Sequence, residues 1–311
     1  MSDYRIQPFS STSYLLLKEL FEAAFHTRLA ESAFKKKYNT QALGHQVIGF
    51  IAIHTATQTP AAFYGVFPVT VVINNREIFA AQSGDTMTHP AHQKKGLFVK
   101  LAELTYDACR SEGIQLIFGQ PNKNSYHGLV NRLHFVHLDD VERYGLKLSI
   151  KTFPLPKLLN KAGLFPFYLR YAKAFLKSRT VKERTSFTNS LQTHHGKVLR
   201  NHAYLNYKNE DDKMFIKIAE VNFWIKLADV LWIGEADNYE AITPAVVKKL
   251  RQLAYVLGYN TIVFHINKSI QKPLFLKSFQ PQASEASCFL YLNKELDQHN
   301  LLLTGADFDT W

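Results

Sequence analysis

The sequence predicts an α/β protein with two lobes, and three observations support this fold class. The chain has 311 residues, of which 46% are hydrophobic and 20% are charged, so it can form a large buried core and two domains. Stretches with strand-like and helix-like periodicity alternate along its first half. A similar order of elements recurs nearer the C-terminus, which indicates an internal repeat.

The first half begins with two helical patterns and continues with strands. Apolar residues recur at helical spacing over residues 13–25 and 30–38. Runs rich in Ile, Val and Phe then predict strands over residues 46–54, 61–73 and 77–88.

A helix, a strand and a shorter helix are expected next. Apolar residues every three or four positions from Leu97 predict a helix, and Gly113 is a natural stop for it. A buried strand over residues 114–119 and a helix over residues 125–133 complete the first lobe.

The last third of the chain resembles a diverged copy of this pattern. It predicts a strand over residues 230–233, a helix over 245–258 and a strand over 261–266. The apolar run that starts at Gly258 repeats the run that starts at Gly113. We therefore expect a second, degenerate copy of the first domain.

The excess of positive over negative charge is concentrated in one stretch. The formal net charge is +11, and residues 145–200 hold twelve Lys and Arg residues against a single acid. Prolines and aromatic residues are interleaved with these bases. We predict a first domain over residues 1–150, a basic Pro- and aromatic-rich linker over 151–185, and a second domain over 186–311.

A membrane-surface helix or a nucleic-acid contact would also use such a stretch. Pro154, Pro156 and Pro166 would interrupt a long amphipathic helix, so the linker interpretation is favoured over contact with a membrane surface. No nucleic-acid partner is expected.

Cysteine and histidine usage predicts neither disulfides nor a metal site. Cys109 and Cys288 are the only cysteines and lie far apart, which fits a reducing compartment. No signal sequence and no apolar window of roughly 18 residues is present, so a cytoplasmic protein is expected. The histidine pairs His89/His92 and His134/His137 lack a nearby Cys or Glu ligand, so no metal is expected.

The most informative segment joins the third predicted strand to the following helix. Its loop, Gln93-Lys94-Lys95-Gly96-Leu97-Phe98, places successive N–H groups at the positive end of that helix. Glycine allows a ligand to approach the main chain closely, and the two lysines add positive charge. Such a loop is suited to a pyrophosphate.

This segment resembles the signature of the GNAT superfamily of acyl-CoA-dependent N-acyltransferases. Thr88, Pro90, Gln93, Gly96 and Phe98 occupy the signature positions, although Thr88 replaces an aliphatic residue and Phe98 a small one. The flanking strands and helices follow the family's order over residues 1–145, and the two-domain layout is similar to that of the Eis-like group.

The resemblance implies a GNAT fold, with a mixed central sheet flanked by helices and a second degenerate GNAT-like domain. It implies that acetyl-CoA is the co-substrate and that pantetheine lies between the fourth and fifth strands of the fold. The residues expected to bind the coenzyme are Met87, Thr88, Gln93, Lys94, Lys95, Gly96, Leu97, Phe98, Asn122 and Ser125.

Three residues are candidates for proton transfer. Asp85 is the only acid near the motif and is a candidate base. Val130 stands where the family usually has a tyrosine acid, and Tyr126 lies one helical turn before it. The Eis-like group suggests the C-terminal carboxylate, here on Trp311, as a further base.

We expect an N-acetyltransferase that moves the acetyl group from acetyl-CoA to a small-molecule primary amine by direct attack in a ternary complex. An amino sugar is the first candidate acceptor, because its amine has a low pKa and needs little help from a base. The alternative is a non-catalytic acyl-CoA-binding or basic interaction protein that keeps the fold.

Overall fold

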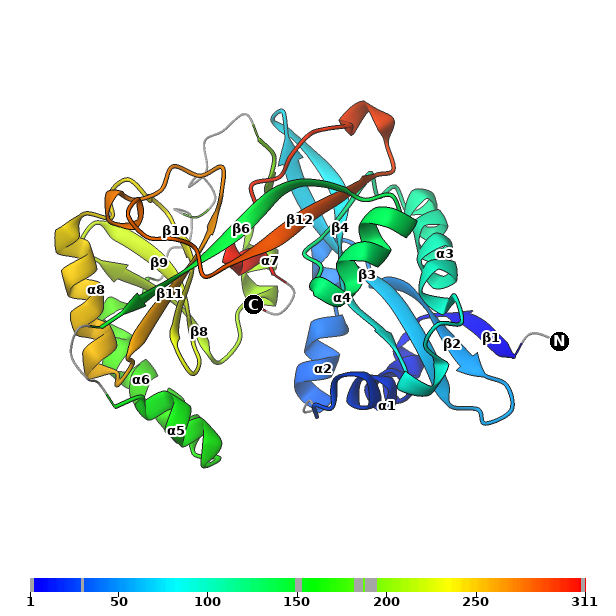
Figure 1. Ribbon diagram of the computed structural model, residues 1–311, viewed down its shortest axis with the longest axis horizontal. Coiled ribbons are helices and arrows are strands. Elements are labelled where there is room, and N and C mark those ends of the chain that lie inside the picture. The colour runs from blue at the N-terminus through cyan, green and yellow to red at the C-terminus, as the bar shows by residue number, and fades with distance from the viewer. Residues whose placement is uncertain (1–2, 29–30, 149–152, 182–186, 188–194, 309–310) are drawn as a thin grey trace. The chain divides into compact units, whose positions relative to one another are not determined.

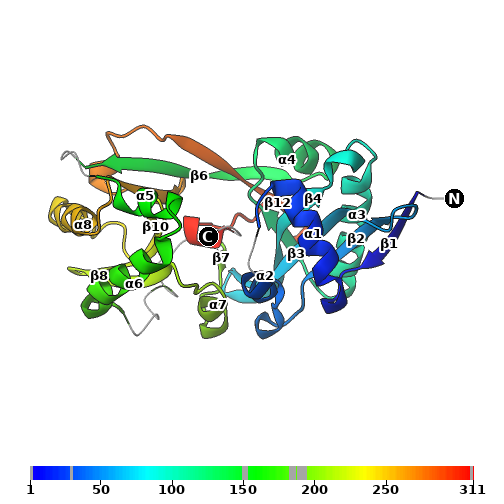
Figure 2. The same cartoon turned by 90° about the horizontal axis from the view of Figure 1, so that it is seen from below.

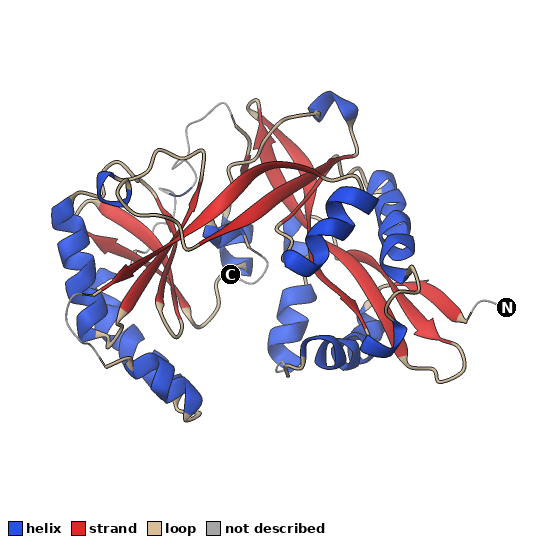
Figure 3. Ribbon diagram, viewed as in Figure 1, coloured by secondary structure: helices blue, strands red, loops and turns tan. Residues whose placement is uncertain are grey.

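The computed structural model divides the chain into two compact units (Figure 1). The first comprises Met1–Leu138 and Ser287–Asn300, and the second comprises Asp139–Ala286 and Leu301–Trp311. Each unit is a mixed sheet with helices packed against it (Figure 3). The residues described are 3–28, 31–148, 153–181, 187, 195–308 and 311.

The first unit has the strand order β1-β2-β3-β4-β5-β12, in which only the β4–β5 pair is parallel and β12 comprises Ala283–Tyr291. Its elements are β1 (Tyr4–Pro8), α1 (Tyr14–Phe25), α2 (Glu31–Tyr38), β2 (Ile48–His54), β3 (Pro60–Ile73), β4 (Arg76–Thr88), α3 (Leu97–Ser111), β5 (Leu116–Gly119), α4 (Lys123–His127) and a π-helical turn (Gly128–Arg132). The elements predicted from periodicity in this half are present, with shifted ends.

Helices cover both faces of the first sheet (Figure 2). Helices α1 and α2 form a core with Phe63 and Phe67 of β3. Helix α3 packs on the opposite face, where Tyr106 reaches the hydroxyl of Tyr64. Cys109 is buried on the same helix, and burial raises the pKa of its thiol to about 12, so the group is an inert apolar side chain.

The second unit repeats the strand arrangement of the first. Its sheet has the order β6-β11-β10-β9-β8, again with one parallel pair, β10–β11, joined by a crossover helix, α8. Its elements are β6 (Val136–Lys147), α5 (Leu155–Lys161), α6 (Phe165–Leu176), β7 (Lys197–Val198), α7 (His202–Tyr207), β8 (Lys213–Ile218), β9 (Val221–Leu227), β10 (Leu231–Ala236), α8 (Pro244–Val256), β11 (Thr261–Asn267) and the short 3₁₀ helix η9 (Gly305–Asp307).

The two units exchange strands. Residues 141–147 of β6 pair with β11 of the second unit, although β6 begins directly after the last turn of the first. Residues 288–291 of β12 return and pair with β5 of the first unit. The expected boundary at residue 150 therefore differs from the observed one at Leu138, because β6 completes the second sheet.

Part of the predicted linker over residues 151–185 is helical. Tyr168, Ala172 and Leu176 of α6 are buried in the core of the second unit. Pro156 and Pro166 occupy the first turns of α5 and α6. An N–H group in the first turn has no helical acceptor, so proline loses no hydrogen bond there, and its fixed φ suits the helix. They start helices that we had expected them to interrupt. Residues 182–186 of the predicted linker lie outside the described residues.

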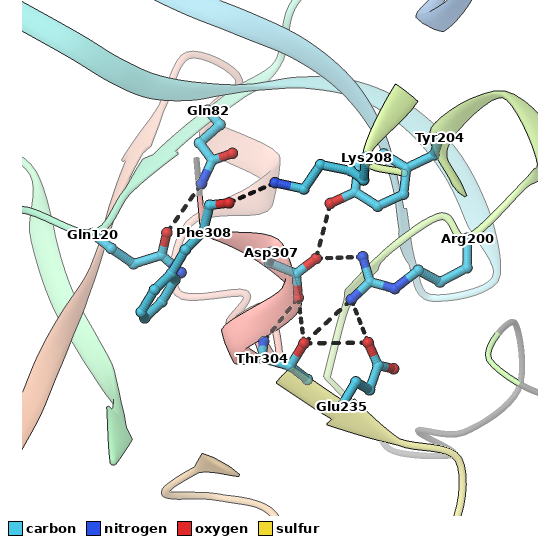
Figure 4. Close-up of polar contacts among 9 residues, drawn as sticks. All are labelled: Gln82, Gln120, Arg200, Tyr204, Lys208, Glu235, Thr304, Asp307 and Phe308. Atoms are coloured by element: carbon cyan, nitrogen blue, oxygen red, sulfur yellow. Dashed lines mark hydrogen bonds and ion pairs between the residues drawn. The ribbon is translucent and has the colours of Figure 1, made fainter. Parts of the chain in front are cut away.

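A buried charged network holds the C-terminal segment in the second unit (Figure 4). Arg200 donates to Glu235 at 2.8 Å and to Asp307, and all three side chains are buried. Thr304 donates to Glu235 at 3.2 Å, and Tyr204 donates to Asp307 at 3.2 Å. Burial opposes ionisation of Asp307, but the Arg200 guanidinium beside it holds the pKa of this carboxyl below its ordinary value.

We predict that Arg200→Ala lowers the unfolding free energy of the second unit by about 3–5 kcal/mol, because it leaves two buried carboxylates without their cation. The three tryptophans of the chain, Trp224, Trp232 and Trp311, all belong to the second unit. Their fluorescence during urea denaturation therefore measures this loss.

Lys173→Ala is the control, since it removes an exposed ion pair with Asp211 in the same unit. We expect it to cost less than about 1 kcal/mol. Equal losses for the two variants would contradict a structural role for the buried network.

Candidate active site

Strands β4 and β5 part where the coenzyme was expected. They pair in parallel only over Ala80–Gln82 and Leu116–Phe118. Beyond Gln82, the described part of β4 continues to Thr88 with β3 as its one partner strand. Main-chain N–H and C=O groups on the other edge of β4 are therefore available to a ligand that lies along the strand.

A β-bulge lies within this part of β4. The register with β3 shifts by one residue between Phe63 and Gly65, and Asp85 adopts a left-handed conformation with φ of 48°. The Asp85 carboxylate accepts hydrogen bonds from Lys37 Nζ and from the Tyr38 hydroxyl, each at 2.8 Å. Both partners belong to α2, so the predicted base is also the group that ties the bulge to that helix.

The predicted phosphate loop is preorganised for an anion. Lys94 and Gly96 have positive φ values of 62° and 74°, and Gly96 is the N-cap of α3 without a side-chain cap. The first hydrogen bond of the helix runs from Lys100 to Gly96, so the preceding N–H groups at this helix start have no helical acceptor. A Cβ added at Gly96 would meet nothing within 4 Å, which leaves room for a phosphate.

Phe98 occupies the motif position where the family has a small residue, and the structure accommodates it. A Cβ added at Gly128 would lie 2.9 Å from the Phe98 ring, so the ring fills space that only glycine leaves open. The ring also packs against Tyr64, with 5.6 Å between the ring centroids. The Tyr64 hydroxyl bonds to Ser83 and Tyr106, and burial raises its pKa to about 12, so it stays protonated.

The predicted acid, Tyr126, lies on α4. Its hydroxyl is 3.0 Å from Nδ1 of His137, and the pair is exposed. The Asn122 side chain caps the same helix by accepting from the N–H groups of Asn124 and Ser125. Val130 belongs to the π-helical turn that follows.

Other predicted residues take different positions. The Met87 side chain is part of the core with α1 and α2, so Met87 can offer a ligand its main chain only. Leu97 is likewise buried, as the first residue of α3. Trp311 lies in the second unit, where a terminal oxygen accepts from buried Lys213. The role of the Trp311 carboxylate as a base stays a prediction.

Sequence patterns did not indicate several residues near this site. Lys37 and Tyr38 lie almost fifty positions before the carboxylate that they bind, and they were assigned only to an amphipathic helix. Gln82 donates to Gln120 at 3.0 Å, directly where the two strands part.

Three histidines lie together near the phosphate loop. His92 lies beside His54 and His89, and Tyr4 hydrogen-bonds to it at 3.1 Å. Burial and these neighbouring histidines lower the pKa of His92. Within the described residues, no group of three or more His, Cys, Asp and Glu is placed to hold a metal ion.

The corresponding region of the second unit is occupied by the chain itself. Strands β10 and β11 also pair over only three residues each before a bulge. The helix η9 lies against both strands, and an added Cβ at Gly305 or at Gly234 would overlap the side chain of His265 or Trp311, respectively. Burial lowers the pKa of His265 to about 4, so this imidazole is neutral at pH 7.

Residues 5–135 match the family described as the acetyltransferase (GNAT) domain. The first unit, which holds these residues, has the parting strands and the helix N-terminus of that fold and is therefore a GNAT acetyltransferase domain. No curated protein matches the chain. No helix among the described residues has the length and apolarity to cross a membrane.

Solved structures share the fold at low identity. A probable N-acyltransferase from Enterococcus faecalis V583 is 14% identical, with a TM-score of 0.59, covering 93% of this chain and 73% of that chain. A putative acetyltransferase from Pyrococcus horikoshii is 12% identical, with a TM-score of 0.53, covering 94% and 90%. The N-myristoyltransferase of Saccharomyces cerevisiae, with bound myristoyl-CoA, is 8% identical, with a TM-score of 0.55, covering 93% and 83%.

We predict that Gly96→Glu abolishes binding of acetyl-CoA, because the substitution adds bulk and negative charge where the pyrophosphate is expected. Gly113→Glu is the matched control. Gly113 lies at the other end of α3, has a φ of 75°, and its added Cβ would also meet nothing within 4 Å. The two variants therefore share the backbone strain and the change in charge.

Calorimetry of the full chain should give one acetyl-CoA per chain, undetectable binding for Gly96→Glu and nearly native binding for Gly113→Glu. A stoichiometry of two, or binding that survives Gly96→Glu, would show that the loop is not the phosphate site.

Proposed function

We propose that the chain transfers the acetyl group of acetyl-CoA to a primary amine by direct attack in a ternary complex. The observation that carries this proposal is the unpaired edge of β4, which leads to the uncapped N-terminus of α3. The helix start would hold the pyrophosphate, and pantetheine would extend along β4. Lys94 and Lys95 would add positive charge near the phosphates.

The reaction requires an N–H donor and two proton transfers. The neutral amine attacks the thioester carbonyl, the C–S bond breaks, the amine loses a proton and the coenzyme thiolate gains one. A main-chain N–H of β4 beyond Gln82 would stabilise the oxyanion without any special side chain. Holding the amine and the thioester together would supply much of the remaining rate.

Tyr126 is the proposed acid for the leaving thiolate. Its hydroxyl is exposed and bonded to His137, which would orient it or return its proton. No other residue of α4 or the following turn is a tyrosine.

We predict that Tyr126→Phe lowers kcat by at least about a hundredfold while the Kd for acetyl-CoA changes little, since a positioned general acid is worth about a hundredfold to ten-thousandfold. Thiol release from acetyl-CoA with a panel of amines, including amino sugars, aminoglycosides and polyamines, provides the assay. Tyr255→Phe, an exposed tyrosine of the second unit, is the matched control.

A loss below about threefold would mean that Tyr126 is structural and that water protonates the thiolate. Binding of acetyl-CoA without turnover of any amine would instead favour a non-catalytic acyl-CoA-binding protein. Longer acyl-CoA donors belong in the same screen, because the acyl chain is not identified by the residues of β4.

Asp85 would serve as a base or as an anchor for the bulge, and its contacts favour the anchor. Its carboxylate already accepts from Lys37 and Tyr38, and its side chain is only 8% exposed. In this role Asp85 is a positioning residue, because it would act through the main chain of β4.

We predict that Asp85→Asn and Lys37→Met each raise KM for acetyl-CoA and lower the unfolding free energy, and that the double variant is much less than additive. If Asp85 is the base, Asp85→Asn alone would lower kcat about a hundredfold or more, with KM and stability nearly unchanged. Steady-state kinetics and urea denaturation of the three variants distinguish the two roles.

A further inference from the structure

The helices α5 and α6 carry an exposed face that is both apolar and basic. Large apolar side chains that remain exposed in this segment are Phe153, Leu158, Leu164, Phe167 and Tyr171. Phe167 is 64% exposed and Tyr171 is 48% exposed, although α6 is packed on the core of its unit. Five large apolar side chains are thus exposed within residues 153–171, and exposed apolar groups that gather together mark interaction surfaces.

The spacing along α6 separates this face from the core. Tyr168 and Ala172 recur four residues apart and are buried. Phe167 and Tyr171 show the same spacing one residue earlier and point outward, with Arg170 between them. The helix therefore has two apolar faces, and the core of the second unit uses one of them.

The same segment is uniformly positive. Residues 153–181 contain no Asp or Glu. Lys173 forms an exposed ion pair with Asp211 of another element. The remaining bases of the segment are exposed and form no ion pair within the described residues: Lys157, Lys161, Arg170, Lys177 and Arg179. Arg170 lies over the Phe167 ring at 5.8 Å, so charge and aromatic surface are directly adjacent.

The prolines do not weaken this surface. Because Pro156 and Pro166 lie in the first turns of α5 and α6, both helices are intact over their whole length. The segment is a pair of short helices with an amphipathic outer face, which is the form that interfacial membrane contacts take.

We propose that the outer face of α5 and α6 docks on the surface of an anionic lipid bilayer. Phe167, Tyr171 and the exposed leucines enter the boundary between headgroups and acyl chains, while the bases attract the lipid phosphates. A nucleic acid offers the same phosphates but no apolar layer for Leu158 and Leu164. This inference is independent of the proposed acetyl transfer.

Sedimentation of the full chain with vesicles tests the proposal. We expect strong binding to vesicles of equal parts phosphatidylcholine and phosphatidylglycerol at low salt, and weak binding to phosphatidylcholine alone. Added salt should reduce the binding without abolishing it, because the apolar contribution is not screened.

Two double variants separate the charged and apolar contributions. Phe167→Ser with Tyr171→Ser should reduce the partition coefficient at least about tenfold. Arg170→Glu with Lys177→Glu should reduce it at least about twenty-five-fold, since each base near such a surface contributes about fivefold. Lys248→Glu with Lys249→Glu, on exposed positions of α8, changes the net charge by the same amount and is the control, expected to bind within about threefold of the native chain.

Circular dichroism establishes that the variants remain folded. The proposal is overturned if the native chain does not sediment with anionic vesicles, or if the α8 control loses as much binding as the α6 charge variant. It is also overturned if removal of the two aromatic residues changes nothing. Binding to a polynucleotide in place of vesicles would assign the surface to nucleic acid.

Discussion

The hydrogen bonds between β5 and β12 are the constraint on which the first unit depends. Strand β5 has four residues, of which three pair with β4, and without Cys288–Tyr291 its other edge would be open. Those residues follow β5 by about 170 positions, and β6 leaves in exchange to pair with β11. A fragment that ends near residue 150 would lack β12, the partner of β5, and would keep β6 without its partner β11. The candidate site therefore has to be studied in the full chain.

The two units share one strand topology, but the region where the parallel strands part differs between them. In each, a parallel pair holds over three residues and a bulge follows, at Asp85 in β4 and next to Gly234 in β10. In the first unit the strand edge leads to a helix start with uncapped N–H groups. In the second, the C-terminal segment lies against both strands and is fixed by the buried network around Arg200. The same geometry leaves a strand edge open beside a helix start in the described part of the first copy, and holds the chain's own C-terminal segment in the second.

The parts of the fold that could be predicted are those whose pattern lies within one segment of the sequence. The strands and helices over residues 13–119 follow periodicity that is contained in each segment, and Gln93–Phe98 combines a loop and a helix start that are adjacent in sequence. The exchange of β6 and β12 could not be predicted, since a strand's sequence does not identify its partner. The interpretation of residues 151–185 as a linker was wrong for the helical part, because a proline that starts a helix and one that interrupts it look alike without the neighbouring contacts.

Phe98 and Asp85 also depend on contacts with residues that are distant in sequence. Phe98 is larger than the residue that the motif has at its position. Gly128, thirty residues later, provides the space that its ring fills. Asp85 looks like a free base in the sequence, yet two residues of α2 occupy its oxygens. In both cases the meaning of a residue is set by a partner that is distant in sequence and in contact in space. A main-chain binding site can therefore be proposed from a short motif, because its N–H donors are consecutive in sequence. The groups that move protons cannot, because each acts through contacts that the fold alone creates.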